Sequence, residues 1–340
     1  MWHLRPRQNS GASIVNIRIT GTGSALPGRI LTNAELETLV DTSDEWITTR
    51  TGIKERRIAG EGEYTSTFAA EAGRNALAMA GVDPRELDLI ILSTVTPDFP
   101  FPSTACIVQD MLGAVNATAF DISAACSGFI YGLSVAEKYL RSGSAKKILI
   151  IGSEVLSRIV NWKDRNTCVL FGDGAGAVVL EASEGNHQLC STHTFSNGAH
   201  WNLLYQPGSG SRHPATDSRT IDGEMLHITM EGNEVFKHAV RAMEEASLKA
   251  LEANGLVADD ISLLIPHQAN RRIIDATAKR LGIEADRQYT NLHRYGNTSS
   301  ASIPIALDEA NRLNVIKPGG KVLLVAFGGG FAYGSALITW

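Results

Sequence analysis

The fold is decided at residues 87–122, which run LDLIILSTVTPDFPFPSTACIVQDMLGAVNATAFDI. The apolar, β-branched run at 87–95 predicts a strand, the helical periodicity at 103–112 predicts a helix, and the run at 117–122 predicts a second strand. This order is typical of α/β proteins with a parallel sheet. It continues outward with a helix after residue 126, a strand at 147–151 and a hairpin strand at 175–180.

The second part of the chain repeats this order of elements. The repeated elements are predicted at 261–266, 272–281, 301–313, 321–327 and 335–340. We therefore predict two similar α/β halves, at 13–184 and 185–340, related by a pseudo-twofold axis and preceded by a loose N-terminal tail at 1–12. The Gly- and Pro-rich segment 185–232 breaks the repeat as long irregular loops, and we expect it to cover one side of a pocket.

The composition argues against several classes of function. The 340 residues carry a formal net charge of −5, so no global basic field is present to hold a nucleic acid or an anionic membrane. No apolar run reaches the roughly 20 residues that span a bilayer, and no secretory signal is visible. The cysteines have no metal or disulfide spacing; they are Cys106, Cys126, Cys168 and Cys190. We expect a cytoplasmic protein with no metal, nucleic-acid or membrane partner.

Cys126 is the candidate nucleophile. It stands in Ala124-Ala-Cys-Ser-Gly128, between a predicted strand and a predicted amphipathic helix, so its sulfur should lie at a helix N-terminus. Unpaired amides and the helix dipole favour a thiolate there. The alternative is a buried inert cysteine, because free cysteine is among the most buried residue types. The other three cysteines stay in that second class.

Two more polar side chains occupy comparable places in the chain. His267 ends the apolar run of Leu264-Ile-Pro-His-Gln-Ala-Asn270, and Asn297 stands in Tyr295-Gly-Asn-Thr-Ser-Ser300. Each alone suits a structural role, as a hydrogen-bonded histidine or a helix cap. Because such positions gather beyond the carboxyl ends of strands, we predict one common site with Cys126. A thiol, an imidazole and an amide donor suit thioester chemistry better than amide hydrolysis.

Glycine runs mark two further features. Phe327-Gly-Gly-Gly-Phe331 follows a predicted strand, and its glycines allow backbone amides to approach a ligand as an oxyanion hole; a tight turn is the alternative. Gly21-Thr-Gly23 and the segment 172–176 lack the full GxGxxG spacing with its strand and helix, which argues against a nucleotide site.

Four motifs in order resemble β-ketoacyl-acyl carrier protein synthase III, a family of thiolase-like condensing enzymes. They are Ala124–Gly128, Pro266–Asn270, Gly296–Ser300 and Phe327–Gly330, within a resemblance that covers Ile14 to Trp340. It implies a duplicated five-layered αβαβα fold, a homodimer and no cofactor. It also implies transfer of a short acyl group, expected to be acetyl, from acyl-CoA to the cysteine. Decarboxylating condensation with malonyl-acyl carrier protein follows and initiates fatty acid biosynthesis.

The resemblance implies the roles of the central residues. Cys126 matches the acylated nucleophile, and His267 and Asn297 match the donors that stabilise the enolate formed on decarboxylation. The amides of Cys126 and Gly329 match the oxyanion hole.

It also implies binding roles farther out. Trp46 and Arg165 match the pair that holds the adenine end of CoA, in keeping with aromatic and guanidinium stacking. Phe101 matches a residue that closes the acyl pocket across the dimer. A basic helix would bind the acidic carrier protein, unless it is only a solvated face; its residues are Arg271, Arg272, Lys279 and Arg280.

The motifs of related condensing enzymes exclude some of the alternative functions. A biosynthetic thiolase needs a second cysteine near the C-terminal glycine run, and none is present. Elongating ketosynthases pair two histidines. Plant-type polyketide synthases share cysteine, histidine and asparagine, so such an enzyme, or another from secondary metabolism, stays an alternative, and acetyl, branched and longer primers stay open. The intact trio Cys126, His267 and Asn297 argues against a non-catalytic scaffold that only binds acyl carriers.

Overall fold

The computed structural model describes residues 15–223 and 225–340. The predicted tail at 1–12 lies outside the described residues. Among the residues that are described, no helix is long and apolar enough to cross a membrane.

The deciding stretch forms the predicted strand, helix and strand. They are β4 (Leu89–Ser93), α4 (Thr104–Leu112) and β5 (Thr118–Ile122). They are followed by α5 (Gly128–Arg141), β6 (Lys147–Val155) and β7 (Asp173–Ala182). β4 pairs in parallel with β5 and with β6, and β6 pairs antiparallel with β7.

The second half repeats this pairing. Its elements are β11 (Leu263–Pro266), α8 (Arg271–Leu281), α10 (Ser302–Arg312), β12 (Lys321–Gly328) and β13 (Ala332–Thr339). β11 pairs in parallel with β12, and β12 pairs antiparallel with β13, as β4, β6 and β7 do in the first half. The structure thus confirms the predicted duplication of elements. The limits of the halves stay a prediction; the division at 184/185 falls between β7 and β8 (Gln188–Ser196).

Two strands that the sequence did not predict join the halves. The sheet has nine strands in the order β11-β12-β13-β8-β1-β7-β6-β4-β5, with β1 (Ile17–Ala25) beside β8. The expectation of irregular structure across 185–232 is therefore wrong for β8. Its sequence, QLCSTHTFS, has few aliphatic residues, so its apolar periodicity is weak. β1 contains glycines because a helix crosses it closely: a Cβ at Gly21 would lie 2.2 Å from the Ala76 carbonyl oxygen of α3 (Thr65–Ala80).

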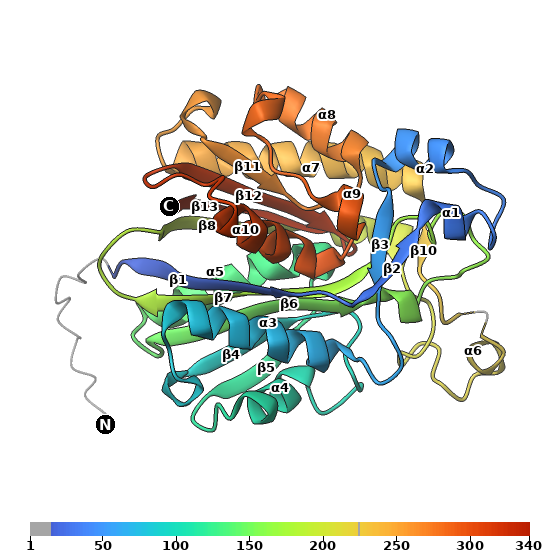
Figure 1. Ribbon diagram of the computed structural model, residues 1–340, viewed down its shortest axis with the longest axis horizontal. Helices are drawn as coiled ribbons and strands as arrows, with labels where there is room; N and C mark the ends of the chain where they lie inside the picture. Colours follow the sequence, from blue (N-terminus) through green and yellow to red (C-terminus); the bar gives the residue numbers. More distant parts are fainter. Residues whose placement is uncertain (1–14, 224) are drawn as a thin grey trace, which may run out of the picture.

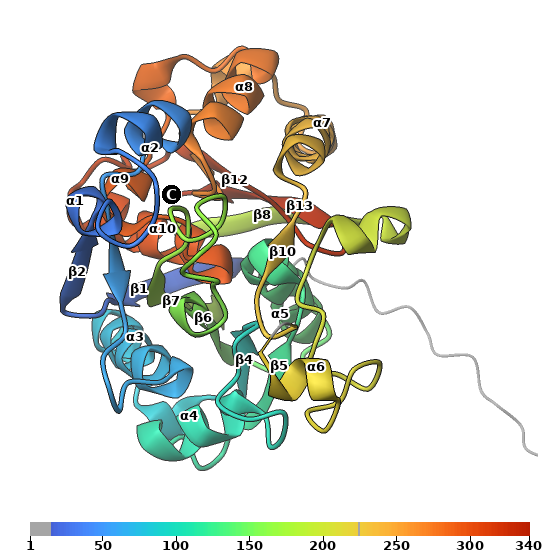
Figure 2. The same ribbon diagram turned by 90° about the vertical axis from the view of Figure 1, so that its right-hand side faces the viewer.

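Helices and half-sheets stack in five layers, which confirms the predicted αβαβα arrangement (Figures 1 and 2). α3 and α4 cover the outer face of the first half-sheet, and α7 (Gly232–Ala253) and α8 cover that of the second. α5 and α10 lie between the half-sheets, where Ile130 and Leu133 of α5 share one apolar core with Ile303 and Leu307 of α10. The starts of these two central helices therefore meet in the middle of the molecule.

Smaller elements surround this framework. The short helices and strands are β2 (Arg29–Thr32), α1 (Asn33–Leu36), α2 (Asp44–Thr51), β3 (Glu55–Ile58), β9 (Leu204–Tyr205), α6 (Ser218–Ile221), β10 (Thr229–Met230) and α9 (Leu292–Tyr295). Short 3-10 segments lie at Pro84–Glu86, Ala125–Ser127, Leu156–Arg158, Gly198–Leu203, Ala258–Asp260, Ala285–Arg287 and Ser299–Ala301.

Candidate active site

Two matching 3-10 turns lie at the centre of the molecule. Cys126 occupies η2 (Ala125–Ser127) before α5, and η7 (Ser299–Ala301) precedes α10. Each turn opens on a residue in the left-handed region, Ala125 with φ 46° and Ser299 with φ 49°. A residue with a Cβ is strained in that conformation, and such strain gathers at functional sites. The duplication thus builds two sharp turns, and the first of them carries the cysteine.

Each turn packs against a strand of the other half, and glycine permits this contact. A Cβ at Gly328 of β12 would lie 2.6 Å from the backbone nitrogen of Cys126, and a Cβ at Gly152 of β6 would lie 2.4 Å from the carbonyl oxygen of Ser300. The glycine run therefore approaches the nucleophile closely and also, through Gly329 and Gly330, turns the chain from β12 into β13. The oxyanion role of the Cys126 and Gly329 amides stays a prediction.

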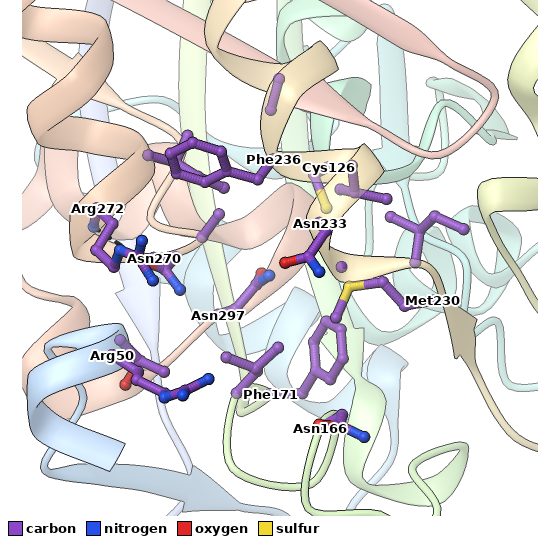
Figure 3. Close-up of a pocket in the computed structure, with 18 of the residues that line it drawn as sticks. Arg50, Cys126, Asn166, Phe171, Met230, Asn233, Phe236, Asn270, Arg272 and Asn297 are labelled. Atoms are coloured by element: carbon purple, nitrogen blue, oxygen red, sulfur yellow. Dashed lines mark hydrogen bonds between the residues drawn. The ribbon is translucent and has the colours of Figure 1, made fainter. Parts of the chain in front are cut away.

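The structure brings Cys126, His267 and Asn297 to one cavity of about 530 Å³. In Figure 3, Arg50 and Arg272 stand on the opposite side of this cavity from Cys126. Segment 185–232 supplies part of the wall, as expected, through Leu204, Met230, Glu231 and Gly232. Among residues 15–223 and 225–340, no cluster of three or more His, Cys, Asp or Glu side chains is placed to hold a metal ion.

His267 presents a neutral imidazole to the cavity. It follows β11 and is only 3% exposed, and this burial lowers the pKa of its ring to about 3. Its Nδ1 atom lies 2.7 Å from the hydroxyl oxygen of Ser302. Nε2 is therefore the ring nitrogen that remains for a ligand.

Asn297 combines the two roles that the sequence left open. Its Oδ1 atom accepts a hydrogen bond from the Ser299 backbone nitrogen at 2.8 Å, so it satisfies the first amide of η7 from the residue before the N-cap position, Thr298. Its backbone is fixed as well, because its nitrogen donates to the Leu170 carbonyl and its carbonyl accepts from Gly172. The amide nitrogen Nδ2 has no protein partner among the described residues and can only donate. A capping residue thus also offers a donor to the cavity.

The thiol of Cys126 is more buried than its position before a helix suggested. Burial raises the pKa of the thiol to about 12, although contact with the Ser299 side chain lowers this pKa and the Glu154 carboxyl raises it. Cys126 is 8% exposed. Loss of solvation therefore outweighs the stabilisation of a thiolate that the helix N-terminus predicts.

Trp46 contacts two guanidinium groups at the other end of the cavity. The Arg50 guanidinium carbon is 4.8 Å from the centre of its ring, and that of Arg165 is 5.2 Å away. Trp46 and Arg50 line the cavity. Arg165 does not line it, but donates to the Asp41 carbonyl at 2.9 Å. The predicted pair is therefore in contact, and Arg50 extends it; the spacing of four residues in one helix was the available signal.

The four basic residues of α8 differ in how they are paired. Arg271 bonds Asp275 at 2.7 Å, and Arg280 bonds Glu244 of α7 at 2.6 Å. Arg272 lies over the Phe236 ring at 5.7 Å and lines the cavity. Neither Arg272 nor Lys279 has an ion pair among the described residues. Arg272 and Lys279 are seven positions apart, which is about two helical turns, so both lie on one side of the helix.

Comparisons with known proteins agree with this geometry. A family model for 3-oxoacyl-[acyl-carrier-protein] synthase III matches residues 120–198, and the model for its C-terminal part matches residues 251–340. A curated relative from Caldanaerobacter subterraneus, a beta-ketoacyl-[acyl-carrier-protein] synthase III, is 55% identical over 322 residues, which cover 95% of this chain and 97% of the relative. This chain belongs to the β-ketoacyl-acyl carrier protein synthase III family.

Solved structures extend the family comparison. The 3-oxoacyl-[acyl-carrier-protein] synthase III of Aquifex aeolicus is 50% identical, with a TM-score of 0.89 over 95% of this chain and all (100%) of that one. The priming β-ketosynthase of the R1128 polyketide pathway is 36% identical, with a TM-score of 0.87 over 95% and 96% of the two chains. As a synthase III family member, the chain is a condensing acyltransferase.

Some polar groups of this synthase III cavity were not found from the sequence. Asn233 at the start of α7 and Asn270 before α8 both line the cavity, as Figure 3 shows. Asn270 also caps α8, because its side chain accepts from the Arg272 nitrogen at 2.9 Å. Its place in Pro266–Asn270 was a signal for it. Asn233 stands in no motif that chemistry alone would single out.

Phe101 does not line the cavity of a single chain. It is 86% exposed, and its neighbour Phe99 is 56% exposed, in the loop between β4 and α4. Such exposure of two aromatic rings is unusual for a solvent-facing loop and typical of a surface that a partner covers. Its place in the acyl pocket of a partner therefore stays a proposal.

Proposed function

We propose that this chain transfers a short acyl group from acyl-CoA to Cys126, with acetyl as the expected group. It then condenses this group with malonyl-acyl carrier protein and releases carbon dioxide, which initiates fatty acid biosynthesis. One observation carries the proposal: a single cavity holds a thiol, two side-chain N–H donors and, at its other end, an aromatic ring beside guanidinium groups. Acyl-CoA and malonyl-acyl carrier protein are substrates, and the reaction uses no cofactor.

In the loading step, the Cys126 sulfur attacks the thioester carbonyl of acyl-CoA. Backbone amides at the start of α5 and in the β12–β13 turn would stabilise the oxyanion, and CoA leaves as the thiol. Trp46 with Arg50 and Arg165 would hold the adenine end of CoA through stacking and charge. The thiol must lose its proton in this step, so the reaction requires a compartment that keeps Cys126 reduced, such as the cytoplasm.

In the condensing step, the malonyl thioester loses carbon dioxide, and negative charge develops on the thioester oxygen. His267 and Asn297 offer donors to this enolate, and its carbon attacks the acyl group on Cys126. The cysteine leaves as a thiolate, and the β-ketoacyl group stays on the carrier protein. Each preorganised donor of this kind stabilises the transition state by about 3 kcal/mol in a site that excludes water.

The partners belong to the same proposal. The acidic carrier protein would dock on α8, where Arg272 and Lys279 have no ion pair within residues 15–223 and 225–340 and Arg272 already borders the cavity. A second copy of the chain would cover Phe99 and Phe101 and lie against β5, which is one of the two edge strands of the sheet. Light scattering of the purified protein should give the mass of a dimer; a monomer would contradict this part.

Intact-protein mass measurement tests the loading step. After incubation with a panel of acyl-CoAs, we expect one acyl group per wild-type chain and none in Cys126→Ala. The peptide that contains Cys126 should be the only modified peptide. An acyl group on Cys106, Cys168 or Cys190 would contradict the assignment. The same panel gives the primer that the enzyme prefers.

A secondary-metabolite role is the second candidate. The likeness to the R1128 priming β-ketosynthase favours it, but identity to that protein is 36%, against 55% to the Caldanaerobacter relative. A marked preference for longer primers over acetyl-CoA in the panel would support the second candidate instead of fatty acid initiation.

A further inference from the structure

Ser302 contacts the imidazole of His267 from inside the protein. It is the first residue of α10, and only 2% of its surface is exposed. Its hydroxyl oxygen lies 2.7 Å from His267 Nδ1 and accepts a hydrogen bond from the backbone nitrogen of Gln268 at 3.3 Å. These are the only hydrogen bonds of this hydroxyl among the described residues.

A count of protons decides the direction of the contact. The Gln268 backbone can only donate, so one lone pair of the Ser302 oxygen is occupied. If Nδ1 also donated, the Ser302 hydroxyl would accept twice and its own proton would lie buried with no acceptor. A buried donor without a partner is unfavourable, whereas donation from Ser302 to Nδ1 satisfies the Ser302 hydroxyl, the Gln268 nitrogen and Nδ1. Nδ1 is then the acceptor, and the single proton of a neutral imidazole lies on Nε2.

The surrounding loop holds this arrangement in place. The His267 backbone nitrogen donates to the Val325 carbonyl of β12 at 2.8 Å. The Gln268 side chain, 1% exposed, donates to the Pro266 carbonyl at 2.6 Å and accepts from the Asn291 nitrogen at 3.0 Å. Because both backbone and side chain of Gln268 are fixed, the donor that occupies Ser302 cannot turn away.

We propose that Ser302 is a positioning residue that fixes His267 as the Nε2–H tautomer, so that the imidazole faces the cavity as a hydrogen-bond donor. The neutral state that burial imposes on His267 is consistent with this. Asn297 follows the same rule: the Ser299 nitrogen occupies its oxygen, which leaves the amide nitrogen as a donor. In both side chains an internal contact thus engages the acceptor atom. The inference rests on the proposed function only where it concerns the enolate.

Nitrogen-15 NMR of the histidine rings tests the tautomer in the full-length protein. The His267 signals are assigned by their loss in His267→Ala. We expect a shift typical of a protonated nitrogen at Nε2 and of an unprotonated nitrogen at Nδ1. A protonated Nδ1 with a bare Nε2 would overturn the proposal, whatever the enzyme does with malonyl thioesters.

Variants then test whether Ser302 sets this tautomer. In Ser302→Ala we expect mixed tautomers and a fall of about tenfold in carbon dioxide release from malonyl-acyl carrier protein, with acylation of Cys126 nearly unchanged. Ser302→Thr keeps the hydroxyl and should restore the wild-type spectrum. Ser335→Ala removes another buried hydroxyl, which lies in β13 and donates to the Ala246 carbonyl of α7, and should leave the His267 signals unchanged.

The outcomes distinguish the role of Ser302 from the proposed function of the enzyme. A pure Nε2–H tautomer and full decarboxylation in Ser302→Ala would overturn the role of Ser302. Unchanged acylation shows that a variant is folded, so a general loss of structure is not mistaken for the expected result. A wild-type protein that showed the Nε2–H tautomer but did not decarboxylate malonyl thioesters would contradict the proposed function and leave the tautomer assignment intact.

Discussion

At the scale of single residues, the cavity depends on groups whose internal contacts leave only one chemical option outward. Asn297 would pass for a helix cap and His267 for a buried structural histidine, and each does have that structural contact. The same contact leaves an N–H group for the cavity. Structural and functional interpretations of such residues therefore do not exclude each other.

Burial of His267 leads to a prediction about pH. An ordinary histidine gains a proton as the pH falls through its usual pKa of 6.5, whereas the pKa of His267 is lowered to about 3, so its ring stays neutral well below pH 6.5. In Cys126→Ala, which removes the thiol from the titration, we expect carbon dioxide release to change less than about twofold between about pH 5.5 and about pH 8.

The rate of labelled carbon dioxide release across this range is the measurement. A loss of activity with an apparent pKa near 6.5 would contradict a permanently neutral His267. The same shift has a consequence for stability: the unfolded chain takes up a proton near pH 6.5 and the folded one does not, so stability due to this group is present above that pH and declines below it.

At the scale of elements, the charges on α8 provide a second prediction. Arg272→Glu with Lys279→Glu should raise the KM for malonyl-acyl carrier protein and leave acylation by acyl-CoA nearly unchanged, because charges at the rim of an interface act mainly on encounter. Added salt should raise the KM of the wild type for malonyl-acyl carrier protein in the same way. Steady-state kinetics with each substrate measures both effects.

A matched control is available at the opposite end of the sheet. Lys146 and Lys317 are exposed and precede β6 and β12, so they lie toward the amino ends of these strands. Lys146→Glu with Lys317→Glu changes the net charge equally and should leave both KM values unaltered. If the α8 variant and the wild type had the same KM for the carrier protein, the charged residues of α8 would only be solvated and would not bind the carrier protein.

The contact between β12 and the nucleophile turn provides a third prediction. In Gly328→Ala the new Cβ would stand 2.6 Å from the Cys126 nitrogen, so the turn or the strand must shift. We expect a loss of about 1–3 kcal/mol in the free energy of unfolding and a strong loss of Cys126 acylation. Gly198→Ala is the control, because no atom lies within 4 Å of its added Cβ. Wild-type acylation in Gly328→Ala would show that this close approach is not needed.

At the scale of the whole molecule, the sequence predicted the parts that apolar periodicity marks. β4, β6, β11 and β12 are almost entirely buried and aliphatic, so their order revealed the duplication. β1 and β8 were missed because their patterns are weak: β1 contains glycines where α3 crosses it, and β8 is largely polar.

The site, like the fold, was predictable only in part from the sequence. Its three central residues stand in motifs at strand ends, so the sequence pointed to them. The contacts that set their chemistry join distant positions: Ser302 is 35 residues from His267, and Asn233 reaches the cavity only because α7 begins there. The burial that makes the Cys126 thiol neutral also depends on packing between the halves. Such effects require the folded structure and cannot be seen in local sequence.

The central claim is that the nucleophile and the decarboxylating donors act in different half-reactions. The most direct test follows the acyl-enzyme and labelled carbon dioxide separately in Cys126→Ala, His267→Ala and Asn297→Ala. Loss of one donor should lower decarboxylation by about 3 kcal/mol, or about a hundredfold, while both donor variants still acquire an acyl group at Cys126. Cys126→Ala should release carbon dioxide slowly and form no β-ketoacyl product. Wild-type decarboxylation in His267→Ala and Asn297→Ala would contradict the proposed roles and leave both residues with structural roles only.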